Sequence, residues 1–133
     1  NVFEMVRKEF NIDENRMYLW GHSMGGAGTY HLAAEHPDLW AAVGVAAPAP
    51  SVEPDQLEDF KDVPIIVLQG DQDPLVTTTR TWVAKMKEIG MAHVYVEVKG
   101  GDHSRFINSS RDTLEKIFAF FNIVRKNQRA ETN

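Results

Sequence analysis

The segment Gly21-His22-Ser23-Met24-Gly25 constrains the fold of this chain more than any other part of the sequence. A short apolar run, residues 17–20, precedes the segment, and a helix-like stretch, residues 25–36, follows it. A serine between glycines at the junction of a strand and a helix is typical of a sharp turn that exposes the serine hydroxyl above the end of a sheet. The sequence therefore predicts a strand–turn–helix unit with Ser23 at the turn.

The residues around Ser23 are expected to serve this turn in two ways. Gly21 and Gly25 are small where a side chain would collide with neighbouring backbone, and Gly26 lets the following helix pack closely. The backbone N–H of Met24 is expected at a helix N-terminus, where it can donate to an oxyanion that develops on a substrate.

Hydrophobic periodicity divides the rest of the chain into alternating strands and helices. Pro37 and Gly90 mark helix ends, Thr77 is expected to cap a helix, and residues 53–62 are expected to form a loop with one helical turn at most. Alternation of this kind predicts an α/β fold, a parallel sheet of about four strands with helices on both faces. The expected strands are residues 17–20, 41–46, 63–68 and 93–98, and the expected helices are residues 1–10, 25–36, 77–89 and 110–124.

Composition excludes several classes of function. The 133 residues fit a single domain, residues 1–133, with 43% hydrophobic and 25% charged residues, and the net charge of −5 argues against nucleic acid as a partner. No apolar run approaches the length of a membrane span, and no cysteine is present for disulfides or thiolate metal sites. Because no H-x-x-x-H pair, G-x-G-x-x-G or P-loop pattern occurs, we expect neither a metal nor a nucleotide cofactor.

Polar residues suited to acyl transfer follow three of the expected strands. Ser23 follows the first strand, Asp71 and Asp73 follow the third, and His103 follows the fourth. The carboxyl ends of parallel strands meet at one edge of a sheet, so these side chains are expected to lie close together. A histidine can take the proton of a serine hydroxyl, and a buried carboxylate can hold the histidine in the required tautomer.

Two aspartates, Asp71 and Asp73, compete for the role of the acid. Asp73 is favoured because it lies deeper in its loop and Pro74 stiffens the turn, whereas Asp71 is expected to shape the loop through hydrogen bonds to the backbone. Asp102 is adjacent to His103 and is expected to be a turn residue, since it can hardly fold back onto that ring.

The remaining histidines are assigned other positions. His22, next to the serine, is a candidate pocket residue, with packing against the next strand as the alternative. Surface or packing positions are expected for His31 and His36, and a solvent-facing position is expected for His93, which begins a strand.

The sequence resembles α/β-hydrolase esterases, most closely the polyhydroxybutyrate-depolymerase and feruloyl-esterase-like enzymes, with the prolyl-oligopeptidase-related esterases beside them. The resemblance implies hydrolysis of carboxylic esters through an acyl-enzyme on Ser23, with Asp73 as the acid, His103 as the base and the Met24 amide as one oxyanion donor. Peptidase and acyltransferase variants use the same residues and stay open. The segments that carry the resemblance are residues 18–30, 36–42, 69–76 and 100–104.

The resemblance covers only the C-terminal half of the family's fold. Enzymes of the family have further strands before the serine turn and take a second oxyanion donor from an early loop, so the chain is expected to be a partial domain with an open edge at residues 17–20. An open edge of this kind predicts self-association or pairing with a missing N-terminal segment. The alternative function is that of a non-catalytic, hydrolase-derived fragment that acts in assembly or binding through this edge.

Overall fold

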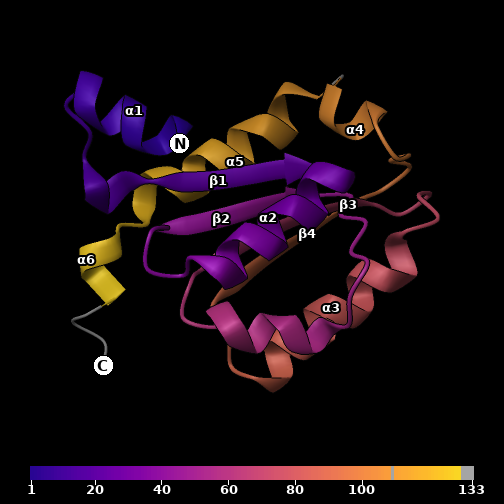
Figure 1. Cartoon of the computed structure of the whole chain (residues 1–133). Helices are drawn as coiled ribbons and strands as arrows, with labels where there is room; N and C mark the ends of the chain where they lie inside the picture. The colour runs from indigo at the N-terminus through magenta and orange to yellow at the C-terminus, as the bar shows by residue number, and fades with distance from the viewer. Residues whose placement is uncertain (109, 130–133) are drawn as a thin grey trace.

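A computed structural model describes residues 1–108 and 110–129 and contains one sheet of four parallel strands, in the order β1-β2-β3-β4 (Figure 1). This sheet confirms the α/β fold predicted from the sequence. The strands are β1 (Tyr18–His22), β2 (Ala42–Ala46), β3 (Ile65–Gly70) and β4 (His93–Val98). The helices are α1 (Val2–Glu9), α2 (Met24–Glu35), α3 (Val76–Glu88), α4 (Arg105–Asn108), α5 (Arg111–Ile123) and α6 (Lys126–Arg129), with 3₁₀-helices η1 (Glu14–Arg16) and η2 (Pro54–Phe60).

Helices cover both faces of the sheet, as predicted. Helices α2 and α3 and the 3₁₀-helix η2, which connect successive strands, pack on one face, where the Trp82 ring stacks on Tyr30 at 4.3 Å between ring centroids. Helix α5 covers the other face, where Phe121 stacks on Tyr18 at 4.7 Å. Alternate residues of the central strands enter these two cores: Val43, Val45, Ile65 and Val67 on the first face, and Ala42, Ala46, Ile66 and Leu68 on the second.

Strands β1 and β3 extend two residues beyond their predicted ends, through the glycines that were expected to begin turns. Gly21 pairs in register with Val45, and Gly70 pairs with Val98. The glycines therefore belong to the sheet, the turn after β1 begins at Ser23, and the loop with the two aspartates begins at Asp71.

Other element boundaries also differ from the prediction. Thr77 does not cap α3, because the helix begins at Val76 and Leu75 occupies the N-cap position without a side-chain hydrogen bond. The segment expected to be mostly loop holds the seven-residue η2, which begins at Pro54, a residue suited to a first helical position. The short helices α4 and α6 were not predicted.

The N-terminal helix forms as its periodicity predicts, but none of its residues is buried. Its apolar residues Val2 and Met5 are exposed, as is Phe10 directly after it, and Trp20 on β1 is 40% exposed. Within the described part of the chain, β1 is an outer strand and pairs only with β2. Phe118, predicted on the apolar face of the last helix, is exposed because α5 presents Ile117 and Phe121 to the sheet.

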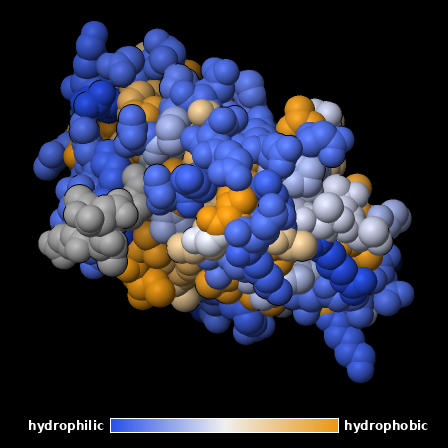
Figure 2. All heavy atoms as spheres, turned by 90° about the horizontal axis from the view of Figure 1, so that it is seen from below, coloured by the Kyte–Doolittle hydropathy of each residue, from blue (hydrophilic) through white to orange (hydrophobic). Residues whose placement is uncertain are grey.

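One face of the molecule, seen in Figure 2, is mostly covered by hydrophilic side chains, with smaller apolar areas between them. In the ranges 1–108 and 110–129, no helix has the length and apolar character needed to cross a membrane.

Two glycines of α2 provide a matched test of this packing. A Cβ on Gly26 would lie 3.0 Å from the Cα of Pro48, whereas a Cβ on Gly28 would meet nothing within 4 Å. We expect Gly28→Ala to raise the free energy of unfolding by about 0.5–1 kcal/mol, because alanine loses less backbone entropy in a helix. Gly26→Ala should lower it by roughly 1–3 kcal/mol through overpacking. Urea unfolding measures both values, and equal stability of the two variants would contradict the close approach of Pro48.

Candidate active site

The turns after β1, β3 and β4 bring three polar side chains into one hydrogen-bonded chain. His103 Nε2 lies 2.9 Å from Ser23 Oγ, and His103 Nδ1 lies 2.7 Å from Asp73 Oδ2. The structure thus places together the serine, acid and histidine that sequence analysis singled out. Since the carboxylate can only accept, Nδ1 carries the proton in this arrangement and Nε2 is free to accept from the serine hydroxyl.

Ser23 occupies a strained backbone conformation, with φ 56° and ψ −118°. Positive φ is uncommon for residues other than glycine, and it persists only where surrounding contacts hold it. The backbone N–H of Ser23 donates to Ala46 O at 2.9 Å, and its carbonyl accepts from the N–H of Ala49 at 3.1 Å and of Gly26 at 3.0 Å. Bonds to the end of β2 and to the loop beyond it therefore fix the turn that presents the hydroxyl.

The glycines around Ser23 differ in what they contribute. A Cβ on Gly21 would lie 2.1 Å from the carbonyl oxygen of Gly25, so only glycine fits at position 21. Gly26 approaches Pro48 as closely as expected, but a Cβ on Gly25 would meet nothing within 4 Å. The expectation that Gly25 itself lacks room for a side chain was wrong, because its backbone, and not the space at its own Cβ, is what crowds Gly21.

The Asp73 carboxyl is held as an anion by its neighbours. Its side chain is only 1% exposed, and burial by itself would raise its pKa. The backbone N–H of Leu75, which donates to Oδ1 at 2.9 Å, opposes that effect together with His103 and the side chain of Gln69. These hydrogen bonds outweigh burial and lower the pKa of Asp73 below the ordinary value of an aspartate.

The loop that carries His103 lies against the end of β3. The carbonyl oxygen of Gly101 accepts from the N–H of Gln72 at 2.9 Å, and the Gly100 N–H donates to Asp71 Oδ1 at 2.7 Å. A Cβ on Gly70 would lie 2.3 Å from the Gly101 oxygen, so backbone packs directly on backbone here. This contact lets the loop that carries His103 extend from β4 across the end of β3. The loop thereby approaches Ser23, which follows β1 at the opposite edge of the sheet.

The remaining candidates take other positions. Asp71 bonds the histidine loop through Gly100, and Asp102 accepts from the N–H groups of Ser104 and Arg105 at the start of α4, which lowers its pKa. His22 Nε2 donates to the backbone carbonyl of His103 at 2.7 Å. The ring of His22 therefore contacts the histidine loop.

The Met24 amide lies in the first turn of α2, where N–H groups have no partner within the helix. The residue Met24 is 82% exposed, and the His103 side chain is 39% exposed. Solvent therefore reaches Met24 and the His103 ring on either side of Ser23.

Sequence analysis overlooked Gln69 and Thr79, two buried polar residues beside the acid loop. Thr79 Oγ1 donates to Gln69 Oε1 at 2.7 Å. The signal in the sequence was Gln69, which directly follows the apolar run of residues 63–68. A polar side chain at the end of a buried strand needs a hydrogen-bond partner.

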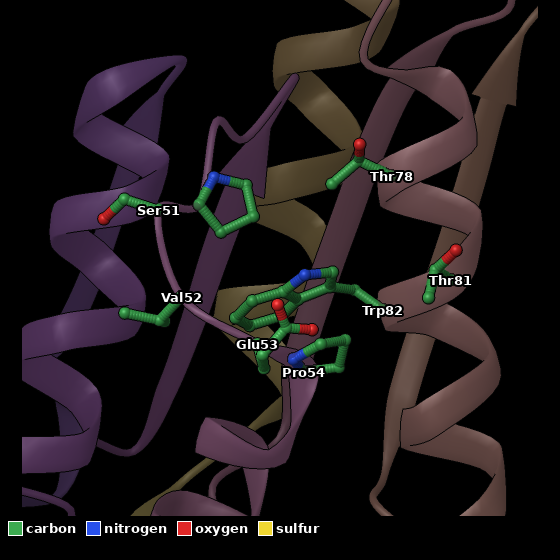
Figure 3. Close-up of a pocket in the computed structure, with 8 residues that line it drawn as sticks. Ser51, Val52, Glu53, Pro54, Thr78, Thr81 and Trp82 are labelled. Atoms are coloured by element: carbon green, nitrogen blue, oxygen red, sulfur yellow. The ribbon is translucent and has the colours of Figure 1, made fainter.

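Figure 3 shows a groove between the loop after β2 and helix α3, with a volume of about 330 Å³. Ser23, Asp73 and His103 do not line it, so the groove and the hydrogen-bonded chain are separate surfaces. Its lining residues are Pro50, Ser51, Val52, Glu53, Pro54, Thr78, Thr81 and Trp82. Among the described residues, no cluster of histidines and acids is arranged to hold a metal ion.

Comparison with known proteins gives consistent matches. A family model described as PET hydrolase-like matches residues 5–125. A stretch of 95 residues is 32% identical to Cutinase 2 of Thermobifida cellulosilytica and covers 69% of this chain and 34% of that protein. A stretch of 78 residues is 36% identical to the bifunctional acetylxylan esterase/xylanase XynS20E of Neocallimastix patriciarum and covers 56% of this chain and 11% of that protein.

Solved structures give the same fold. A thermostable esterase superposes with a TM-score of 0.77 at 31% identity, covering 93% of this chain and 36% of that one. The S-formylglutathione hydrolase FrmB of Staphylococcus aureus superposes with a TM-score of 0.71 at 17% identity, covering 90% and 57%, and shows the fold alone. The matched segment spans about a third of the length of the Thermobifida cutinases.

The depressed pKa of Asp73 predicts a pH-dependent contribution to stability. A carboxyl whose pKa is lower in the folded than in the unfolded chain stabilises the fold above its ordinary value near pH 3.9, and this stabilisation is lost as pH falls through the folded pKa. We expect Asp73→Asn to lower the free energy of unfolding by about 1–3 kcal/mol at pH 7, since it removes a buried, charge-assisted hydrogen bond. The difference in the free energy of unfolding between wild type and Asp73→Asn should become smaller towards pH 3.

Urea unfolding of both proteins at pH 7 and pH 3 measures this difference. Asp38→Asn, at an exposed position, is the control for removing one negative charge. A destabilisation by Asp73→Asn that is the same at both pH values would contradict the prediction.

Proposed function

Since the chain belongs to the PET hydrolase-like family, we propose that it carries the catalytic residues of a serine hydrolase acting on carboxylic esters. The observation that supports this most is the unbroken hydrogen-bonded chain from Ser23 Oγ through the His103 ring to Asp73, at 2.9 and 2.7 Å. The cutinases and esterases among its relatives favour an ester over a peptide as substrate.

In the proposed mechanism, Ser23 Oγ attacks the ester carbonyl while His103 Nε2 takes its proton. The buried Asp73 carboxylate stabilises the imidazolium that forms. The Met24 N–H donates to the oxyanion of the tetrahedral intermediate, and His103 then protonates the departing alcohol. Water, deprotonated by the same histidine, attacks the acyl-enzyme and releases the acid and Ser23.

The surroundings of Ser23 favour an ester presented at the surface. His103 and Met24 are open to solvent, and the groove of Figure 3 lies apart from the serine. The narrower resemblance to polyhydroxybutyrate depolymerases and feruloyl esterases stays a prediction. We assign Met24 as one oxyanion donor, and removal of one such donor from an enzyme typically lowers turnover by about 10²–10³-fold. With only this donor assigned, we expect weak turnover from the present chain.

Hydrolysis of p-nitrophenyl acetate and butyrate by the purified chain tests the proposal. We expect a weak activity that falls by at least about 10³-fold in Ser23→Ala, because the nucleophile is removed. Ser51→Ala, which changes an exposed serine in the neighbouring loop, should leave the rate unchanged. Equal hydrolysis by wild type and Ser23→Ala would contradict the proposed nucleophile.

A second candidate function is assembly through the outer edge of β1. The exposed Trp20 on this strand and the absence of buried residues on α1 support it. We expect the chain to self-associate, or to pair with a separate segment that adds strands, because unpaired backbone on an apolar edge strand favours pairing.

Light scattering after gel filtration measures this association. Trp20→Lys, which adds a charge to the β1 edge, should lower the associated fraction, whereas Val94→Lys, at an exposed position of the opposite outer strand, should not. A monodisperse monomer with a turnover of about 10 s⁻¹, a typical value for an enzyme, would contradict both the association and the weak activity.

A further inference from the structure

Two buried polar side chains beside Asp73 have no part in the mechanism above. Gln69 on β3 is fully buried and Thr79 on α3 is 1% exposed, and Thr79 Oγ1 donates to Gln69 Oε1 at 2.7 Å. A glutamine at the end of an apolar strand costs free energy unless both ends of its amide have partners. The amide therefore has a defined set of neighbours, and its orientation can be derived from them.

The orientation of the Gln69 amide follows from what lies at each end. Because Oε1 accepts from Thr79, Nε2 points the other way, where it donates to the Gly70 carbonyl at 3.2 Å. The Gln69 side chain also helps to lower the pKa of Asp73. The opposite orientation would place Oε1 against the Gly70 carbonyl oxygen, which only accepts. The threonine hydroxyl suits the observed orientation, since it can donate to Oε1.

We propose that Thr79 and Gln69 form a buried relay that positions the Asp73 carboxylate for His103. Thr79 fixes the amide through Oε1, and Nε2 donates to the Gly70 carbonyl, which also accepts from the Asp73 N–H at 3.3 Å. The Leu75 N–H holds Asp73 Oδ1. With these donors in place, Oδ2 is directed at His103 Nδ1. Gln69 and Thr79 are positioning residues, and their contribution to turnover rests on the proposed esterase function.

Loss of the Thr79 hydroxyl frees the Gln69 amide to rotate, so that Nε2 no longer holds the Gly70 carbonyl to which the Asp73 N–H donates. In Thr79→Val, which keeps the side-chain shape, we expect the titration of the Asp73 carboxyl to move to higher pH by about 0.5–1 unit, because the Gln69 side chain, which helps to lower the pKa of Asp73, is no longer held in place. Turnover should fall by roughly 3–10-fold with KM unchanged, because His103 is held less accurately. Thr79→Ser keeps the hydroxyl and should restore both properties.

A double variant separates positioning from stability. Thr79→Val with Gln69→Met replaces both partners by apolar groups of similar shape, which is expected to be nearly neutral in stability. If the pair only stabilised the fold, this variant would recover wild-type properties. If the pair positions Asp73, the double variant is stable and keeps the shifted titration and the lowered turnover.

Carbon-13 NMR titration of the Asp73 carboxyl and p-nitrophenyl acetate kinetics provide the measurements. An unshifted Asp73 titration in both Thr79→Val and the double variant would overturn the relay. The NMR titration does not depend on catalysis. If the wild-type chain hydrolyses no ester, the proposed function is contradicted, and the titration still tests the relay. Should Thr79→Val fold poorly, the double variant and Thr79→Ser carry the same test.

Discussion

The crossing of the histidine loop over the end of β3 is the contact on which the site depends. β1 and β4 are the two outer strands of the described sheet, so Ser23 and His103 start from opposite sides of it. The 99–104 loop closes this distance by lying on Gly70, where any Cβ would meet the Gly101 oxygen at 2.3 Å. A side chain at this crossing would lift the loop and draw His103 away from Ser23. The geometry of the hydrogen-bonded chain is therefore set by backbone contact, and the pair of glycines makes that contact feasible.

The sequence was sufficient for the parts of the molecule that depend on local pattern and strand direction. Apolar runs as short as residues 17–20 indicated strands, and the alternation of strands with helices indicated that the strands are parallel. Parallel strands place their carboxyl ends together, so the side chains that follow β1, β3 and β4 were expected to meet without knowledge of any contact. The preference for Asp73 over Asp71 came from position in the loop, and in the structure Asp73 contacts His103 while Asp71 bonds Gly100.

Features that depend on contacts between distant atoms could not be predicted from pattern. Helical periodicity identified α1 but gave no information on what covers its apolar residues, and all of them are unburied. The motif suggested that both flanking glycines of the serine turn lack space, whereas only the Cβ of Gly21 would collide with backbone. The bond between Thr79 and Gln69 joins a helix to a strand ten residues earlier, and propensity carries no information about which buried polar groups face each other.

Burial decreases along the hydrogen-bonded chain from acid to base, and this gradient is consistent with the proposed chemistry. The Asp73 side chain is 1% exposed, so its charge acts in a medium that weakens electrostatic interactions less than water does. The His103 side chain is 39% exposed, so it can exchange protons with an arriving water or a departing alcohol. A buried histidine would hinder that exchange, and an exposed carboxylate would hold the imidazolium less firmly. In the proposed mechanism, the described loops thus supply the groups that transfer protons. The surface next to Met24 and His103 then determines which ester binds.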